Sequence, residues 1–137
     1  MEDEGLAEAF WAVARRLRQH TRAALEPWDL SPSLARALTA LGRHGDQRLS
    51  ALAEHLRIAP RTATEVVDDL QRRDLAERRP DPADRRAVLV ALTPAGRAAS
   101  SAIQTARQAE AQRFFAALSA ADRDELARLL ATLRESS

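Results

Sequence analysis

The chain has 137 residues, of which 45% are apolar and 30% charged, and this predicts one soluble globular domain with a buried core. It contains no cysteine, so disulfide bonds, thiol redox sensing, thiolate zinc sites and cysteine nucleophiles are excluded. The formal net charge of +1 does not identify a nucleic-acid binder by itself, but all 21 basic residues are arginine, whose planar guanidinium suits phosphate and guanine.

The first residues do not resemble a targeting signal. They read Met-Glu-Asp-Glu, which is acidic where a secretory leader would be basic. No apolar run approaches the roughly 18 residues that a membrane-spanning helix needs. We therefore expect a cytoplasmic protein that does not enter a membrane.

Two amphipathic helices open the chain. Residues 6–25 carry apolar side chains at helical spacing, and the pattern ends before a proline. The apolar stripe of this helix consists of Leu6, Phe10, Val13 and Leu17. Ser31 and Pro32 predict the start of a second helix, which we expect to stop at Gly42. Residues 43–47 then read as a polar loop.

The next two helices are short and close together. Ser50 is the expected N-cap of a helix that ends at Leu56. Pro60 starts the second, whose apolar residues follow the i, i+3, i+4, i+7 pattern. Those residues are Ala63, Val66, Val67 and Leu70. Two short helices joined by about three residues are typical of a helix-turn-helix.

A β-hairpin follows. Residues 76–79 are its expected first strand, and the proline-rich residues 80–83 are its tip. After the tip, an apolar alternation predicts a strand with Val88, Val90 and Leu92 on one face. Strand spacing places Asp84 and Arg86 on the same side, so the aspartate is expected to hold the arginine side chain extended. A stiff hairpin with two arginines suits a narrow, negatively charged groove, which points to DNA.

Two helices close the chain. Thr93 and Pro94 predict the start of a long helix that reaches about residue 118, and Ser119 is the expected N-cap of the last one. The last helix has an apolar stripe of Leu126, Leu129, Leu130 and Leu133. The predicted fold is therefore mainly α with a small β-hairpin wing. It is a single domain over residues 1–137, with a winged helix at about 30–93 flanked by helices at about 4–26 and 94–135.

The flanking helices predict a homodimer. Each has an apolar stripe, and neither stripe belongs to the winged helix. Packing both stripes against a second copy buries them and gives the dimer two DNA-binding winged helices. The alternative is that they cover the winged helix within one chain.

Several of these segments together resemble the MarR family of bacterial transcription regulators. The matching segments are Leu49–Leu56, Val66–Leu70, Leu75–Arg78, Asp84-Arg85-Arg86 and Leu92–Gly96. The match covers roughly residues 30–135, and its most specific part is the Asp-x-Arg wing followed by Leu-Thr-x-x-Gly. The resemblance implies a homodimeric winged-helix protein that binds palindromic DNA, often represses, and is often released by a small aromatic ligand.

The chain departs from the family pattern at several positions. Arg57 and Asp74 stand where glycine is usual, so both turns must form without the residue that best tolerates a left-handed backbone. The helix that starts at Pro60 has Glu65 and Asp69 where family members often carry arginine. We expect these departures to leave the fold intact.

The residues expected to contact DNA lie on the Pro60 helix and on the hairpin. N-terminal positions of a recognition helix reach base edges, so Arg61 is the best candidate for a contact to guanine. Thr62, Thr64 and Glu65 flank it, although Arg61–Glu65 and Asp68–Arg72 are also spaced for ordinary helix ion pairs. One of the wing arginines is expected in the minor groove. The complete predicted set is Ser50, Arg57, Arg61, Thr62, Thr64, Glu65, Arg79, Asp84, Arg85 and Arg86, with Ser50, Arg57 and Arg79 assigned to phosphates.

Effectors of this family lie between the dimer helices and the winged helix. By that resemblance, the candidate ligand residues are Trp11, Arg15, His20 and Trp28. The alternative is that both tryptophans only pack. The three histidines lack the spacing of a metal site, and no cofactor is expected.

Two other functional classes remain as alternatives. An enzyme is disfavoured, because the chain has no nucleophile with a plausible base, no glycine-rich phosphate loop and no acid pair in an apolar context. A winged helix that binds only proteins would not need so many wing arginines. The salt dependence of DNA affinity distinguishes a DNA-binding winged helix from one that binds only proteins, because affinity for phosphates falls steeply with salt.

Overall fold

The structure is a computed structural model and describes residues 2–136. The chain divides into two compact units. Residues 24–106 form one, called the winged-helix unit below. The residues up to Ala23 and those from Arg107 onward form the other, called the terminal unit.

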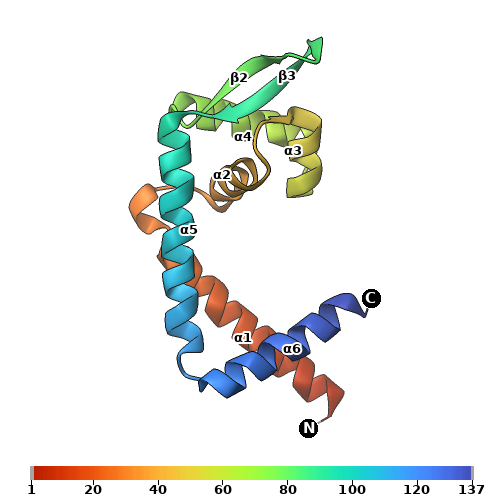
Figure 1. Ribbon diagram of the computed structural model, residues 1–137, viewed down its shortest axis with the longest axis vertical. Helices are drawn as coiled ribbons and strands as arrows, with labels where there is room; N and C mark the ends of the chain where they lie inside the picture. The colour runs from red at the N-terminus through yellow and green to blue at the C-terminus, as the bar shows by residue number, and fades with distance from the viewer. Residues whose placement is uncertain (1, 137) are drawn as a thin grey trace. The chain divides into compact units, whose positions relative to one another are not determined.

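The winged-helix unit has the predicted order of elements (Figure 1). A short 3-10 turn η1 (Glu26–Trp28) precedes its helices and strands. These are α2 (Pro32–His44), β1 (Gln47–Arg48), α3 (Leu49–Leu56), α4 (Pro60–Arg72), β2 (Ala76–Asp81), β3 (Asp84–Leu92) and the first part of α5 (Pro94–Phe115). The strands form an antiparallel sheet in the order β1-β3-β2. The prediction of a mainly α fold with a small β wing is confirmed.

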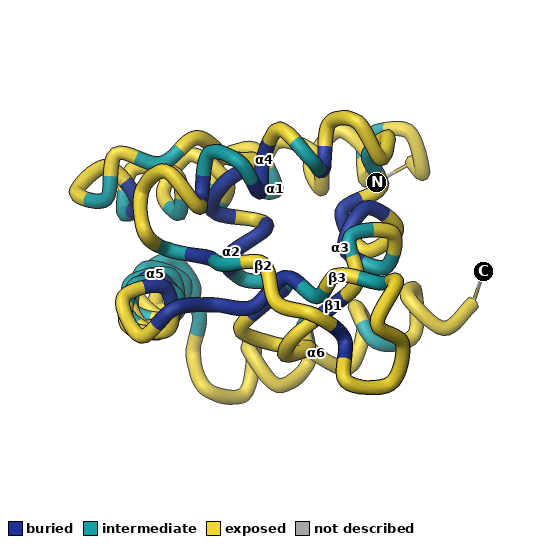
Figure 2. The backbone as a smooth tube through the Cα atoms, turned by 90° about the horizontal axis from the view of Figure 1, so that it is seen from above, coloured by how far each residue is buried: buried dark blue, intermediate teal, exposed yellow. Residues whose placement is uncertain are grey.

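The core of this unit lies between α2, α3, α4 and the sheet, where the buried stretches of backbone gather (Figure 2). Its most deeply buried side chains are Leu38, Leu52, Val67, Leu70, Val90 and Ile103. Burying a side chain of this size contributes about 1.5–3 kcal/mol. The core therefore fixes α4 and the base of the β2–β3 hairpin, and Val88, which was predicted to share a face with Val90, is exposed beyond it.

Three of the predicted helix starts are confirmed. Ser31 Oγ accepts from the N–H of Leu34, and Ser119 Oγ accepts from the N–H of Asp122. Thr93 Oγ1 accepts from the N–H of Gly96 at 3.0 Å. Each bond satisfies a donor that the first turn of a helix leaves open.

Other boundaries were predicted wrongly. Ser50 lies inside α3, because that helix starts at Leu49 with Arg48 as its N-cap. The second helix continues through Gly42 to His44, since Gly42 packs closely against Ser100 of α5 and does not end the helix. The first helix ends at Ala23 and α5 at Phe115, both earlier than expected.

The strands also differ from the prediction. The expected loop over residues 43–47 contains the start of β1, whose Gln47 pairs with Val90. A strand of two residues is too short to show an alternating pattern. The first wing strand runs to Asp81, so Pro80 lies in the strand; β2 is an edge strand, where proline is tolerated.

Two of the departures from the family pattern, Arg57 and Asp74, lie at left-handed turns. Arg57 has φ 55° and Asp74 has φ 60°. Both follow the ends of helices, where glycine would adopt this backbone without a steric cost. The fold keeps the turn geometry although neither residue is glycine.

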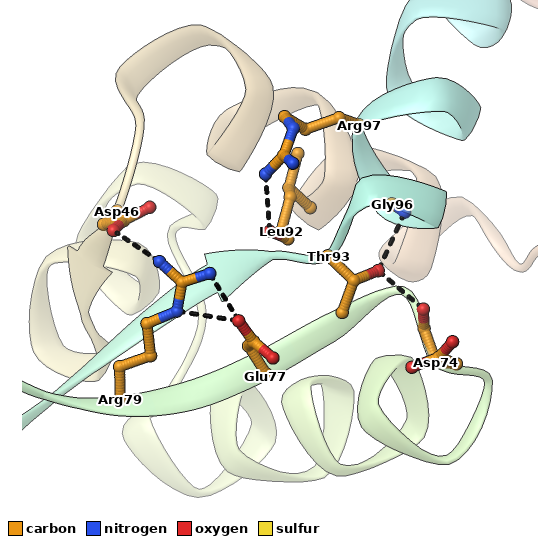
Figure 3. Close-up of polar contacts among 8 residues, drawn as sticks. All are labelled: Asp46, Asp74, Glu77, Arg79, Leu92, Thr93, Gly96 and Arg97. Carbon is orange, nitrogen blue, oxygen red and sulfur yellow. Dashed lines mark hydrogen bonds and ion pairs between the residues drawn. The ribbon is translucent and has the colours of Figure 1, made fainter.

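Gly96 is the glycine whose replacement we expect to damage the fold. Thr93 Oγ1 donates to the carbonyl of Asp74 at 2.6 Å, which draws the start of α5 onto the turn before β2 (Figure 3). A Cβ on Gly96 would overlap the backbone carbonyl of Leu75, which has no freedom to rotate away. Gly96→Ala is therefore expected to lower the free energy of unfolding by about 1–3 kcal/mol, measured by urea titration.

Gly42→Ala is the matched control. A Cβ at Gly42 would meet the hydroxyl of Ser100, which can rotate, and alanine improves helix propensity by about 1 kcal/mol. This variant should unfold close to the wild-type urea midpoint. Equal midpoints for the two variants would contradict the account of Gly96.

The terminal unit contains α1 (Asp3–Ala23), the end of α5 and α6 (Ala120–Glu135). Near the C-terminal end of α1, His20 Nδ1 lies 3.4 Å from Glu110 Oε1, and its ring contacts Phe114 edge-on. Neither α1 nor α6 has a buried residue among those described. In the part of the chain that the structure describes, no helix has the length and apolarity needed to span a membrane.

Candidate nucleic-acid interface

Helix α4 presents a polar face whose N-terminal end is open. Ala63, Val66, Val67 and Leu70 are buried on the opposite face, as predicted. Arg61, Thr62 and Glu65 are exposed, and Thr64 is half-buried with its hydroxyl donating to the carbonyl of Pro60. The expected Arg61–Glu65 ion pair does not form, which leaves the Arg61 guanidinium without a partner among the described residues.

The C-terminal end of α4 differs from the expected pairing. Arg72 pairs with Asp69 at 2.5 Å and not with Asp68. Asp68 instead accepts from Arg78 of β2 at 2.7 Å, and the same guanidinium donates to Gln71. Arg72 and Arg78 each have a carboxylate partner here, while Arg73, which follows the helix, donates to the backbone carbonyl of Asp29.

The hairpin of β2 and β3, called the wing below, projects beyond the helices of its unit (Figure 1). Asp84 Oδ1 accepts from the backbone N–H of Arg86 at 3.0 Å. The prediction that Asp84 holds the Arg86 side chain was therefore wrong: a short carboxylate reaches the N–H two residues on and fixes the backbone. Arg85 and Arg86 are exposed, and neither guanidinium has a partner among the described residues.

Arg79, which was expected to contact phosphate, has two carboxylate partners (Figure 3). Its Nε donates to Glu77 at 2.7 Å, and its Nη1 lies 3.8 Å from Asp46. The hydrogen bond to Glu77, with the charges of Glu77 and Asp46, raises the pKa of Arg79 above its usual value. A phosphate would have to compete with these carboxylates, so Arg79 is the weakest of the predicted arginine contacts.

The arginines of the winged-helix unit fall into two groups. Seven donate to a carboxylate, an amide or a backbone carbonyl; they are Arg36, Arg48, Arg72, Arg73, Arg78, Arg79 and Arg97. Five have no partner among the described residues; they are Arg43, Arg57, Arg61, Arg85 and Arg86. Four of these five are predicted DNA contacts. Most of the arginines that are free to bind an external anion are therefore residues that were predicted from the sequence. Arg43, near the end of α2, was not predicted.

The comparisons with known proteins agree with this geometry. The MarR family profile matches residues 30–88. An HTH-type transcriptional regulator of Mycobacterium bovis is 32% identical over 124 residues, which cover 90% of this chain and 87% of that protein. The chain belongs to the MarR family. It is therefore a DNA-binding transcription regulator, and its relatives are named as regulators and not as enzymes.

Two further proteins to which the chain is similar have names that describe regulation. The HTH-type transcriptional repressor MdtR of Bacillus subtilis is 23% identical over 92% of this chain and 81% of its own length. The solved structure of BpsR from Bordetella bronchiseptica is 27% identical, with a TM-score of 0.74, and covers 96% of this chain and 94% of BpsR. The DNA binding of BpsR is regulated by 6-hydroxynicotinic acid.

The remaining predicted DNA residues of this MarR-family chain lie on α3 and at the turn after it. Ser50 is exposed near the start of α3, and its hydroxyl is not used as a helix cap. Arg57 occupies the left-handed turn after α3, and its side chain is exposed. Both side chains are accessible to a phosphate, and their roles stay predictions.

The predicted ligand residues are divided between the two units. Trp28 packs against the core of the winged-helix unit, in line with the alternative that it is a packing residue. Trp11 is 57% exposed on α1 and contacts Phe10 edge-on, with ring centroids 5.8 Å apart. Arg15 is exposed, and His20 contacts Glu110 and Phe114. Over residues 2–136, no group of three or more potential ligands could hold a metal ion.

One ion pair of the wing was not predicted from the sequence. Arg48 of β1 donates to Asp81 at the end of β2, 33 residues later. The only local signal was an aspartate between two prolines, which we interpreted as a hairpin tip. A partner so distant in sequence cannot be found from residue spacing.

Proposed function

We propose that the protein is a homodimeric repressor in the cytoplasm that binds a palindromic operator and is released by a small aromatic ligand. The observation that carries the DNA-binding part is the set of arginines at the start of α4 and at the end of the wing that have no partner among the described residues. Arg61 is suited to a guanine in the major groove, and Arg85 or Arg86 to the adjacent minor groove.

The apolar surface of the terminal unit supports the dimer. Large apolar side chains that are at least 38% exposed lie on α1 and α6: Leu6, Phe10, Trp11, Val13, Leu129, Leu130 and Leu133. Leu17 and Leu126 of the same stripes are half-buried. Large apolar side chains left exposed along two helices are typical of a protein interface, and a second copy offers the same side chains in return.

Two-fold symmetry then sets the form of the operator. Two identical recognition helices can enter successive major grooves only on the same face of the duplex. The half-sites should therefore be inverted repeats whose centres lie about 10 base pairs apart.

Repression and release are supported by the relatives. MdtR is named a repressor, and BpsR is regulated by an aromatic acid. In this chain, Trp11 is exposed on α1 and offers aromatic surface, and Arg15, exposed on the same helix, offers a partner for an anion. Calorimetric titration with aromatic acids, in which Trp11→Leu abolishes the heat of binding, would support this assignment, and unchanged binding by that variant would overturn it.

A salt titration of duplex binding tests the proposal against the protein-interaction alternative. If four or more arginines neutralise phosphates, the logarithm of the affinity should fall linearly with the logarithm of the salt concentration, with a slope of about −0.9 for each contact. If the protein does not bind duplex DNA even at low salt, the result would favour a winged helix that binds only proteins.

A further inference from the structure

Asp81 is a nearly buried carboxylate at the end of an otherwise exposed hairpin. It is 8% exposed, whereas residues 82–86 are all exposed. Buried carboxylates are rare unless they are paired, so the partners of Asp81 have to be identified. It also lies where the register between β2 and β3 shifts, at the pair Asp81–Asp84.

Both oxygens of the Asp81 carboxylate accept hydrogen bonds. Arg48 Nε donates to its Oδ2 at 3.0 Å, and Arg48 Nη2 lies 2.9 Å from the same oxygen. The backbone N–H of Ala83 donates to its Oδ1 at 2.9 Å. The Ala83 N–H, followed by the Arg48 guanidinium, lowers the pKa of the Asp81 carboxyl, so the carboxylate stays ionised at neutral pH.

Arg48 joins this carboxylate to the helix-turn-helix. It is the N-cap residue of α3, and it pairs with Leu89 in the sheet. Its side chain therefore connects the start of α3 with the outer end of the wing. Asp84, the residue after Ala83, in turn fixes the backbone of Arg86.

We propose that the Arg48–Asp81 ion pair is a positioning device that holds the end of the wing at a fixed place relative to the helix-turn-helix. Arg85 and Arg86 then reach DNA at a set distance from Arg61. This inference rests on the proposed DNA-binding function and adds two residues that do not themselves have to touch DNA.

The physical reason is the conformational freedom of an isolated hairpin. Two strands alone are marginally stable in water, and the outer half of the wing has no core beneath it. Without the ion pair, the wing would sample many orientations, and DNA binding would have to order them. Ordering a wing and its arginines on binding should weaken the affinity by about 10-fold.

Asp81→Asn tests the role, because it keeps the shape of the side chain and removes the charge. Removing a negative charge close to DNA would, by electrostatics alone, tighten binding. We expect the opposite, about a 10-fold weaker affinity for the selected duplex. Arg48→Gln should give a similar loss and serves as a second variant if one of them folds poorly. Glu125→Gln is a charge control, since it removes one carboxylate charge from the exposed Glu125–Arg128 pair on α6 and should leave DNA affinity unchanged.

A double-mutant cycle separates positioning from a general effect on the fold. If Asp81 acts through the wing arginines, Asp81→Asn should have little further effect once Arg85 and Arg86 are both alanine. Hydrogen exchange should rise at residues 82–88 while α2 and α4 stay protected. Additive losses in the cycle, or faster exchange throughout the unit, would overturn the positioning role.

The two proposals fail in different ways. If the wild-type protein binds no duplex, the proposed function is wrong. If the wild-type protein binds and Asp81→Asn binds equally or more tightly, only the positioning role is wrong.

Discussion

Aspartate at both Leu129 and Leu133 is expected to convert the proposed dimer into a monomer of 15.1 kDa. Leu129 is 45% exposed and Leu133 65% exposed in the single chain, so the substitutions should not unfold α6. In a dimer interface they would place unpaired charges out of contact with water, which costs several kcal/mol. Light scattering at micromolar concentration measures the result directly.

Loss of the dimer should also reduce operator binding. A single recognition unit cannot use the second half-site, and the lost multivalency should weaken binding by about 100-fold or more. Thr132→Asp is the control, because it adds a single negative charge at an exposed position of α6 outside the apolar stripe. A double variant that remains dimeric, or a wild-type protein that is monomeric at this concentration, would show that α6 does not form the interface.

Alanine substitutions at Arg61 and Arg86 should impair DNA binding in different ways. Arg61→Ala removes the proposed contact to guanine and should weaken binding to the operator by about 1–3 kcal/mol, with relaxed preference at one base pair of each half-site. Arg86→Ala removes a contact to the minor groove and the phosphates. Its affinity should fall on all sequences, and the salt dependence should become less steep.

Arg72→Ala is the matched control for this pair. Arg72 is an exposed arginine on the same helix as Arg61, but its guanidinium already pairs with Asp69. Its removal should change operator affinity by less than about 1 kcal/mol. If Arg61→Ala instead weakened binding to operator and random duplex equally, α4 would not read bases, and sequence specificity would have to come from the wing.

The elements that follow from local rules were predictable from the sequence. Ser31, Thr93 and Ser119 cap helices because a hydroxyl before a helix can accept from the first turn, whatever the rest of the chain does. The apolar spacing along α4 gave its buried face correctly. The winged-helix order and the exposed arginines of the site followed from these local patterns.

What was not predictable depends on contacts between distant segments. Arg78 pairs with Asp68, and Arg48 with Asp81, across 10 and 33 residues. Spacing along one helix instead suggested an Asp68–Arg72 pair, which does not form. Gly42 was interpreted as a stop signal, although it allows close contact with Ser100, 58 residues later. In each case the partner is set by the packing of elements and not by the sequence around the residue.

Selection of bound sequences from a random duplex pool would show which DNA sequence this regulator recognises. We expect enrichment of an inverted repeat with half-site centres about 10 base pairs apart, and loss of preference at one position of each half-site for Arg61→Ala. A wild-type pool with no enriched sequence after several rounds at low salt would contradict this expectation.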